Sequence, residues 1–327
     1  MNDIYITGTA AVVPQNTSGP EWIECPSGPE DGFFKAIEPP YTEFLNPLAM
    51  RRMSRTLKNG LTCGMMCLKD SGISQPDAII TATGYGCLED TATFLDKVTK
   101  PERQVLNPTP FIQSTHNAVA GVIALQTKCN GYNNTFTQRG FSFESALTEA
   151  MLMLKEEQMH HVLLGGMDEL TRPLYQILMK LRDLRPDTQG MVPPGEGTIF
   201  LMISSVPSRN AIRVASFSSS YKPGNNEPKS LLSEIIRVHG VPDLVLTGAN
   251  GYPANDKHYN CIMELLPDIK ILSYKRYCGE YPTAPAFAHW MACEILKRDT
   301  ALLGSPKSIL IYNHFENRYH SFTLLKL

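Results

Sequence analysis

Hydrophobic positions along the chain follow two patterns, short apolar runs and stretches in which apolar residues recur every three or four positions. The first pattern is typical of buried strands and the second of amphipathic helices. In the first part of the chain the runs predict strands at 3–13, 78–83, 134–137, 161–164 and 198–204. The helical spacing predicts helices over 46–70, 88–98, 118–125, 143–157 and 171–182, whereas the Pro- and Gly-rich residues 14–45 predict a long loop.

The same order of elements returns in the second part of the chain. Strands are expected at 212–218, 243–247, 269–273, 308–313 and 319–326, and helices over 229–239, 255–265 and 283–298. In each part strands alternate with helices, and the second part ends on two consecutive strands. This order predicts an α/β protein of two related halves, residues 1–205 and 206–327, whose mixed sheets pack together in one compact unit.

Residues 134–150 predict the end of a strand, a tight turn at Arg139-Gly140 and the start of a helix. Gly140 can adopt a backbone conformation that other residues avoid. A junction of this kind can carry a nucleophile, because a helix N-terminus favours a developing anion. The turn contains no Cys, and the nearest Ser is Ser142. The stretch is therefore compatible with three interpretations: an active site, a former active site, or a segment with a purely structural role.

Composition narrows the class of protein. The chain has 327 residues, of which 43% are hydrophobic and 19% charged, enough for a sizeable core. A formal net charge of −2 argues against nonspecific binding to nucleic acid or acidic membranes. We find no signal segment and no apolar run long enough to span a bilayer. These features predict a soluble cytoplasmic protein.

Motifs for cofactors and metals do not stand out. The eight cysteines are scattered without the paired spacing of a zinc site or a disulfide framework. Cys63 and Cys67 share a face of an expected helix, but no His or second Cys pair accompanies them. The sequence has no Walker loop, dinucleotide fingerprint, GxSxG elbow or HExxH. No cofactor and no metal are therefore expected.

Five segments resemble four motifs of the β-ketoacyl-acyl-carrier-protein synthases. Residues 184–187 and 191–198 (LRPD and MVPPGEGT) resemble the RPFD…GFVxGEGAG segment, and 165–169 (GGMDE) resembles the GG(A/M)(D/E) strand end. Residues 244–256 resemble the strand and loop of the second half, and 271–279 resemble STKSMxGH with Lys275 and Gly279 kept. The likeness covers nearly the whole chain, and the combination of motifs is specific.

A further segment is similar to a short subgroup of this family. Residues 107–121 read NPTPFIQSTHNAVAG, which resembles SPTxFSxSVHNAxAG. That subgroup includes chain-length-factor-like partners from aryl polyene and flexirubin-type pathways. The resemblance implies the thiolase fold, a five-layered αβαβα arrangement of two similar halves. It also implies a heterodimer with a ketosynthase, or a homodimer, with acyl carrier protein as a further candidate partner.

The resemblance also locates the catalytic positions. Condensing members use a Cys that accepts the acyl chain and two His that stabilise the enolate. Counting from the matched motifs places these three residues at Gly140, Gly248 and Glu280, with the family's Lys retained as Lys275. Gly carries no nucleophile, and a carboxylate opposes the stabilisation of an anion. The resemblance thus implies a ketosynthase frame without the Cys-His-His residues.

Several assignments around this frame stay open. A shift of one or two residues would put Gln138 at the Cys position, where some chain-length factors carry Gln. Glu280 is expected either to act in the pocket or to pair with a cation such as Arg276. Arg51, Arg52 and Arg55 form a basic cluster, which we interpret as the solvated face of a helix. The candidate substrate-pocket residues are Gln138, Phe141, Phe143, His116, Phe111 and Phe315.

Three functions are compatible with the sequence. The first is a non-catalytic, chain-length-factor-type subunit that pairs with an active ketosynthase. The second is an enzyme of the same fold with altered chemistry that uses Gln138, Ser142 or Glu280. The third is a homodimeric scaffold with no part in condensation.

Overall fold

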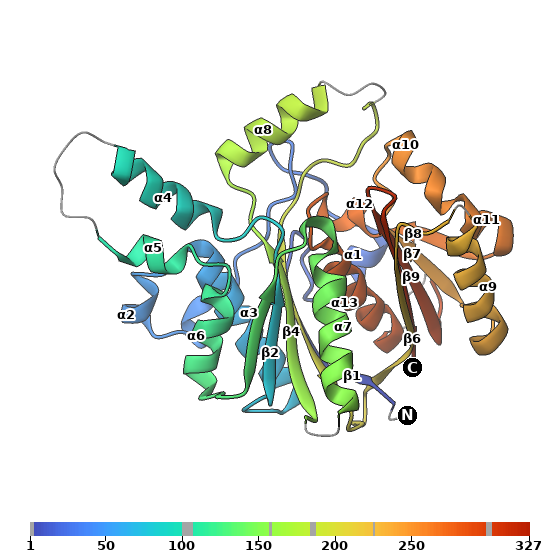
Figure 1. The fold of residues 1–327 in the computed structure, drawn as a ribbon, viewed down its shortest axis with the longest axis horizontal. Coiled ribbons are helices and arrows are strands. Elements are labelled where there is room, and N and C mark those ends of the chain that lie inside the picture. Colours follow the sequence, from blue (N-terminus) through green and yellow to red (C-terminus); the bar gives the residue numbers. More distant parts are fainter. Residues whose placement is uncertain (1–2, 100–106, 157–158, 184–187, 225, 299–302) are drawn as a thin grey trace.

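The computed structural model describes residues 3–99, 107–156, 159–183, 188–224, 226–298 and 303–327 (Figure 1). The motif-like segment 184–187 lies outside these residues. The strands are β1 (Tyr5–Val12), β2 (Ala78–Ala82), β3 (Tyr132–Phe136), β4 (His161–Asp168), β5 (Gly197–Ser204), β6 (Ile212–Tyr221), β7 (Leu244–Thr247), β8 (Lys270–Ser273), β9 (Ser308–Phe315) and β10 (Tyr319–Lys326). Across the described ranges they pair in the order β3-β2-β4-β5-β1-β6-β10-β9-β7-β8.

The two ends of this order have the same topology. β3, β2 and β4 are parallel, and β5 and β1 follow in antiparallel pairings. β8, β7 and β9 are likewise parallel, and β10 and β6 follow in antiparallel pairings. The two groups of five strands are joined by a short pairing of Tyr5 and Ile6 with Arg213 and Ile212. Residues that follow parallel strands of both groups, such as Gly84 after β2 and Asn250 after β7, line one cleft.

Helices cover the outer faces of the strands and fill the space between the two groups (Figure 1). α7 and α13 pack between the groups, and their side chains, such as Phe143 and Phe287, belong to one cluster with strands of both. α3 and α6 cover the first group, and α9 and α11 cover the second. The helices are α1 (Glu21–Glu24), α2 (Pro47–Met50), α3 (Arg55–Ser71), α4 (Leu88–Thr99), α5 (Thr109–Gln113), α6 (Ala118–Thr127), α7 (Ser142–Lys155), α8 (Arg172–Asp183), α9 (Glu227–His239), α10 (Pro253–Asp256), α11 (Asn260–Leu265), α12 (Lys275–Cys278) and α13 (Ala284–Lys297), with 3₁₀ turns η1 (Tyr41–Glu43), η2 (Arg139–Phe141) and η3 (Lys257–Tyr259).

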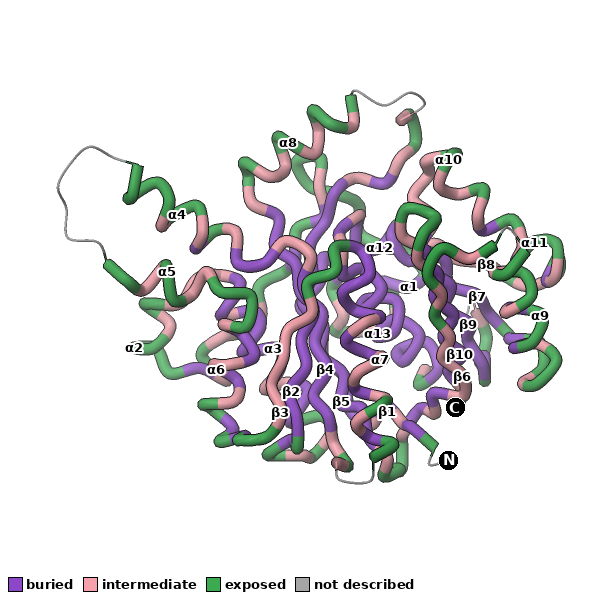
Figure 2. The backbone as a smooth tube through the Cα atoms, viewed as in Figure 1, coloured by how far each residue is buried: buried purple, intermediate pink, exposed green. Residues whose placement is uncertain are grey.

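Burial follows this layering (Figure 2). Every residue of α13 from Ala284 to Leu296 is buried, as expected of a helix with strands on both sides. By contrast, α8 has no buried residue and lies at the periphery. No helix within the described ranges is long and apolar enough to cross a membrane.

The helix expected over 46–70 is divided in two. Asn46 caps α2, and the Ser54 side chain accepts a hydrogen bond from the Leu57 amide to start α3 anew. α3 ends at Gly72, which adopts a left-handed conformation with φ of 72°. The expected helix over 255–265 is likewise divided into α10, η3 and α11, and the expected loop 14–45 contains α1 and η1.

The prediction of a solvated basic face is wrong for one of its three arginines. Arg51 and Arg52 are exposed, whereas the Arg55 side chain is 19% exposed and forms an ion pair with Glu196 at 2.6 Å. The restart of the helix at Ser54 turns Arg55 toward Glu196, which precedes β5, and Glu169, which follows β4. Arg55 therefore neutralises buried charge rather than forming a basic surface.

Candidate functional site

A cleft of about 690 Å³ lies where elements of both halves converge. Its wall includes the turn at Arg139-Gly140, the end of β9 with Phe315, and the side chains of Lys275 and Glu280. These residues are far apart in the sequence, so the fold alone brings them together. Three positions named from the resemblance, Gly140, Lys275 and Glu280, line one cleft.

Gly140 lies buried beneath the ring of Phe315. A Cβ built on Gly140 would contact this ring, 2.7 Å from Cε2 and 2.8 Å from Cγ, which is closer than real Cβ atoms approach. The ring is held over the turn because β9 runs to Phe315 before a reversal at Glu316 and Asn317, both with φ of 52°. A side chain at position 140 would have to displace Phe315.

The left-handed backbone of this turn is at Arg139, with φ of 54°, and not at Gly140. The conformational freedom of Gly is therefore not used at position 140. The ring of Phe315 occupies the space that a side chain at position 140 would need, so only Gly fits there. The Arg139 guanidinium lies 5.5 Å from the centroid of the same ring, so the turn contacts Phe315 from two positions.

Polar side chains surround Gly248 in the same way. A Cβ on Gly248 would lie 2.6 Å from Asn313 Oδ1, 2.7 Å from the Tyr274 hydroxyl and 2.8 Å from the Tyr259 hydroxyl. The Tyr274 hydroxyl donates to Asn313 Oδ1 at 2.9 Å, which fixes two of these groups. An imidazole at 248 would overlap all three groups, so the present packing requires Gly at this position.

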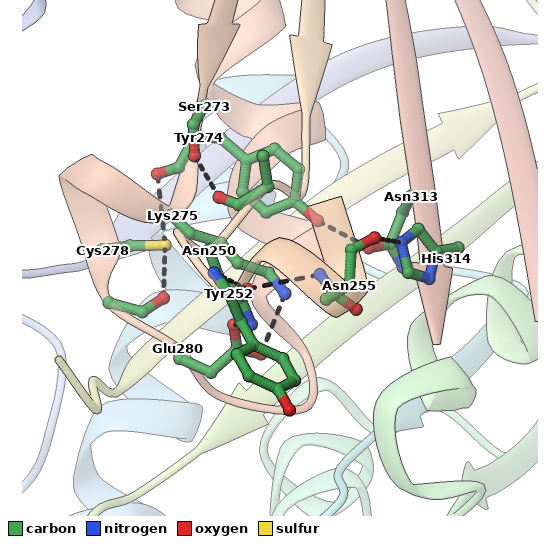
Figure 3. Close-up of polar contacts among 12 residues, drawn as sticks. Asn250, Tyr252, Asn255, Ser273, Tyr274, Lys275, Cys278, Glu280, Asn313 and His314 are labelled. Atoms are coloured by element: carbon green, nitrogen blue, oxygen red, sulfur yellow. Dashed lines mark hydrogen bonds and ion pairs between the residues drawn. The ribbon is translucent and has the colours of Figure 1, made fainter. Parts of the chain in front are cut away.

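Glu280 forms an ion pair with Lys275 (Figure 3). Lys275 Nζ donates to Glu280 Oε1 at 2.8 Å, and Asn250 Nδ2 donates to Glu280 Oε2 at 3.0 Å. Glu280 pairs with a cation, as one of the two expectations held, but the cation is Lys275 and not Arg276. Arg276 is exposed on α12, whereas Lys275 is turned toward the cleft. The retained Lys275 is thus a buried charge whose partner is Glu280.

Glu144 lies behind the cleft in the first turn of α7 and is fully buried. Its Oε1 accepts from Asn313 Nδ2 at 2.7 Å and from the Ser321 hydroxyl at 3.2 Å, while Oε2 has no hydrogen-bond partner in the described part of the chain. Burial raises the pKa of this carboxyl to about 7, against the hydrogen bonds and the charge of Lys275, which lower it. Glu144 therefore gains or loses its proton near neutral pH.

Glu144→Gln is expected to change how stability depends on pH. The folded-state pKa rises from the ordinary 4.5 to about 7, so the folded chain keeps a proton that the unfolded chain releases. The stabilisation is full below the lower value and is lost as pH rises through the higher one, by on the order of 3 kcal/mol. Urea denaturation across this range should show wild type losing that much relative to the variant.

Glu149→Gln on the same helix is the matched control for this measurement. Glu149 is partly exposed, so this variant should keep the pH dependence of wild type. If wild type and Glu144→Gln differ by less than about 1 kcal/mol across the range, Glu144 does not hold a proton in the folded chain.

Asp168, at the end of β4, fixes two loops at the cleft. Its Oδ1 accepts from the Thr83 hydroxyl at 2.8 Å and from the amides of Gly84 and Tyr85 at 2.9 and 2.8 Å. Its Oδ2 accepts from the amide and hydroxyl of Thr283 at 2.9 and 2.8 Å. Burial raises the pKa of this carboxyl, whereas its hydrogen bonds lower it. The Gly84-Tyr85 wall of the cleft depends on this one carboxylate.

The six pocket residues named from the sequence do not all meet. Phe315 lines the cleft, whereas Phe143 lies in the central core against His289 and Phe141 stacks on Tyr319. The others lie outside the lining of the cleft. Gln138 is exposed with its side-chain oxygen bound to the Ser145 hydroxyl, His116 is exposed beside Gly86, and Phe111 is 57% exposed on α5.

Sequence reasoning missed two histidines at the cleft. His258 and His314 line it, with their rings 5.1 Å apart. Burial lowers the pKa of His314 to about 3, and its Nε2 hydrogen-bonds the Asn255 carbonyl at 3.0 Å. A histidine of such low pKa is neutral and a weak base at neutral pH. His258 lies in η3 and His314 in β9, and the two residues meet only where these elements pack together. No local sequence motif therefore marks the pair.

Comparison with known proteins places this geometry in context. Residues 22–198 match the family model described as "Beta-ketoacyl synthase, N-terminal domain". No curated protein sequence matches the chain. Among solved structures, "The ishigamide ketosynthase/chain length factor" is similar with a TM-score of 0.82 and 16% identity, covering 99% of this chain and 99% of that chain.

Two further solved structures are similar over nearly their full length. "AntDE:AntF (apo): type II PKS acyl-carrier protein in complex with its ketosynthase bound to the hexaketide" gives a TM-score of 0.77 at 13% identity, covering 100% of this chain and 99% of that one. A β-ketoacyl synthase from Burkholderia phymatum STM815 gives 0.75 at 13% identity, with the same coverage. At these identities the likeness shows the fold, and the predicted thiolase fold is confirmed.

Proposed function

Since the chain belongs to the β-ketoacyl synthase family, we propose that it is a non-condensing, chain-length-factor-type subunit that pairs with an active β-ketoacyl-acyl-carrier-protein synthase. One observation carries the proposal. The resemblance assigns the Cys and first His positions of the family to Gly140 and Gly248, and other side chains fill the space around both glycines. The frame is kept while the two sites of condensing chemistry are closed.

The chemistry of condensation explains why these changes matter together. The reaction needs a thiolate to carry the acyl chain and neutral donors to stabilise the enolate oxygen. In this chain the ring of Phe315 covers the turn at Gly140. The position that the resemblance assigns to the second His carries a carboxylate, Glu280, which is bound to Lys275. Restoring one residue would leave the other two requirements unmet.

The proposed partner is an active ketosynthase of a fatty-acid or polyketide-type pathway, of the aryl polyene kind. The similar ishigamide structure is a ketosynthase with a chain length factor, which supports a pair of related chains. Residues 107–121 carry the motif that resembles the aryl polyene subgroup. In the pair, this chain would help to shape the pocket that measures the growing acyl chain. Acyl carrier protein would deliver its acyl groups mainly to the active site of the partner.

An enzyme with altered chemistry is less well supported. Ser142 is buried, and its hydroxyl contacts the Thr83 and Arg139 carbonyls and the Gln138 amide, so it is held within the elbow. Gln138 lies on the surface, and Glu280 is engaged by Lys275 and Asn250. None of the three residues presents a free reactive group to the cleft.

Co-expression tests the proposed function. This chain and a ketosynthase encoded beside it are purified together, and condensation of acyl- and malonyl-carrier protein is measured with and without this chain. We expect the two chains to co-purify and the products to shorten, or to vanish, when this chain is omitted. A partner that condenses to the same products alone would overturn the proposal.

Gly140→Cys is expected to restore no condensation. The new side chain must displace Phe315, which should cost about 1–3 kcal/mol of folding stability. The thiol should react slowly with iodoacetamide, because Gly140 is buried, and Phe315→Ala in addition should make it react readily. Mass spectrometry follows the labelling, and a condensation assay on both variants should remain at background. Condensation by either variant would show that Gly248 and Glu280 do not block the chemistry.

A further inference from the structure

The carboxylate of Glu280 is bound as a ligand would be, with each of its oxygens held by a different donor. The Lys275 ammonium donates to Oε1 at 2.8 Å, and the Asn250 amide donates to Oε2 at 3.0 Å (Figure 3). A cation and an N–H placed on the two oxygens of one carboxylate form a charge-assisted pair of bonds. The question is whether the donors depend on Glu280 or are placed independently of it.

Asn250 is oriented by groups other than Glu280. Its Oδ1 accepts from the Tyr252 amide at 3.1 Å and from Asn255 Nδ2 at 3.3 Å. Its own backbone amide donates to Asp256 Oδ1 at 3.0 Å. Because the oxygen of the side-chain amide is fixed on one side, its NH₂ group faces the position of the Glu280 carboxylate whether or not that carboxylate is present.

The main chain of Lys275 is also held by groups other than Glu280. It begins α12, where its carbonyl accepts from the Gly279 amide at 2.8 Å, and it follows Tyr274, whose hydroxyl is bound to Asn313. The Lys275 side chain is 8% exposed. A charge so far from water requires an anion beside it, so this position retains affinity for a carboxylate.

The Glu280 side chain reaches this site from the edge of the cleft. Its backbone is held on both sides, since its amide donates to the Pro193 carbonyl at 2.9 Å and its carbonyl accepts from the Gly195 amide at 3.1 Å. The side chain itself is 37% exposed and lines the cleft. It can therefore leave its donors by rotating about side-chain bonds while the main chain stays in place.

We propose that Lys275 and Asn250 form a carboxylate-binding site, and that Glu280 occupies this site as an internal ligand that keeps external carboxylates out of the cleft. The ligand class is an organic carboxylate, free or at the end of an acyl group. Two donors on the two oxygens of one carboxylate fit this class, and the adjoining volume of about 690 Å³ leaves room for the rest of such a molecule. The inference goes beyond the proposed function and does not depend on a partner subunit.

The test uses the full chain in three forms: wild type, Glu280→Ala and Glu280→Gln. The probe is sodium acetate, with sodium chloride at equal ionic strength as the reference, and binding is measured by calorimetry and by the shift in melting temperature. Glu280→Ala vacates the site and should bind acetate at least about tenfold more tightly than wild type. Glu280→Gln fills the same space with a neutral group and should bind it more weakly than Glu280→Ala.

A second substitution identifies the donors. Asn250→Ala added to Glu280→Ala should reduce the gain in acetate affinity, and Lys275→Met added to it should abolish the gain. Inorganic phosphate serves as a competing anion, and Glu280→Ala should prefer acetate to phosphate. Preference for phosphate would overturn the assignment to carboxylates.

Two other results would overturn the proposal. One is equal acetate binding by wild type and Glu280→Ala, and the other is a Glu280→Ala chain that stays unfolded with or without acetate. In the second case the carboxylate would be a structural part of the chain and not a ligand. Acetate binding is measured on the lone protein, so its failure is distinct from a failure to support a ketosynthase.

Discussion

Replacing Arg55 with Met will lower the free energy of unfolding by about 3–5 kcal/mol, the cost of removing one partner from a buried ion pair. Arg55 Nη2 and Nη1 bind the two oxygens of Glu196 at 2.6 and 2.9 Å. Nη1 also lies 3.4 Å from Glu169 Oε1. The side chains of Glu196 and Glu169 are only 2% and 8% exposed, so water cannot replace the lost cation.

The other hydrogen bonds of Glu196 prevent its carboxylate from moving to solvent when Arg55 is removed. Glu196 also accepts hydrogen bonds from the amides of Ala36 and Leu170, which tie three segments to the start of β5. Its carboxylate cannot turn to solvent without breaking these bonds.

Urea denaturation of three variants and wild type checks this result. Arg52→Met, at an exposed neighbouring position, should stay within about 0.5 kcal/mol of wild type. The double variant Arg55→Met with Glu196→Gln should regain part of the loss, since the buried charge is then gone. A loss below about 1 kcal/mol in Arg55→Met would mean that Glu196 is not an uncompensated charge in the variant.

Replacing Asp168 with Asn will lower the free energy of unfolding by about 2–4 kcal/mol, although the two side chains have nearly the same shape. Both Asp168 oxygens act only as acceptors, toward Thr83, Gly84 and Tyr85 on one side and Thr283 on the other. Asn has one oxygen and one NH₂ group. Whichever way it turns, a donor faces a backbone N–H donor, and at least one buried amide loses its partner.

Amide hydrogen exchange identifies which amide loses its hydrogen bond when Asp168 is replaced by Asn. In Asp168→Asn the Tyr85 or the Thr283 amide should exchange faster than in wild type, beyond the general loss of stability. Asp183→Asn, exposed at the end of α8, is the matched control and should change neither amide. Unchanged protection of both amides would mean that Asp168 does not hold the two loops.

The sequence by itself determined the order of the elements and the family. Strands and helices were visible because their periodicities are local, so runs such as 161–164 and the spacing from Phe143 to Ala150 report their own surroundings. The boundaries that failed, at Ser54 and within 255–265, depend on caps and turns that periodicity does not register. The substituted positions Gly140, Gly248 and Glu280 could also be named, because spacing from a motif needs no coordinates.

Only the tertiary structure decided what occupies those positions. Phe315 covers Gly140, Asn313 reaches Glu144 across 169 positions, and Arg55 meets Glu196 across 141. The partner of Glu280 is Lys275 and not its neighbour Arg276, because the orientation of α12 turns one toward the cleft and leaves the other exposed. Local patterns record which residues are buried, but the pairing of buried groups is set by the packing of distant segments, where space and unpaired charge allow few arrangements.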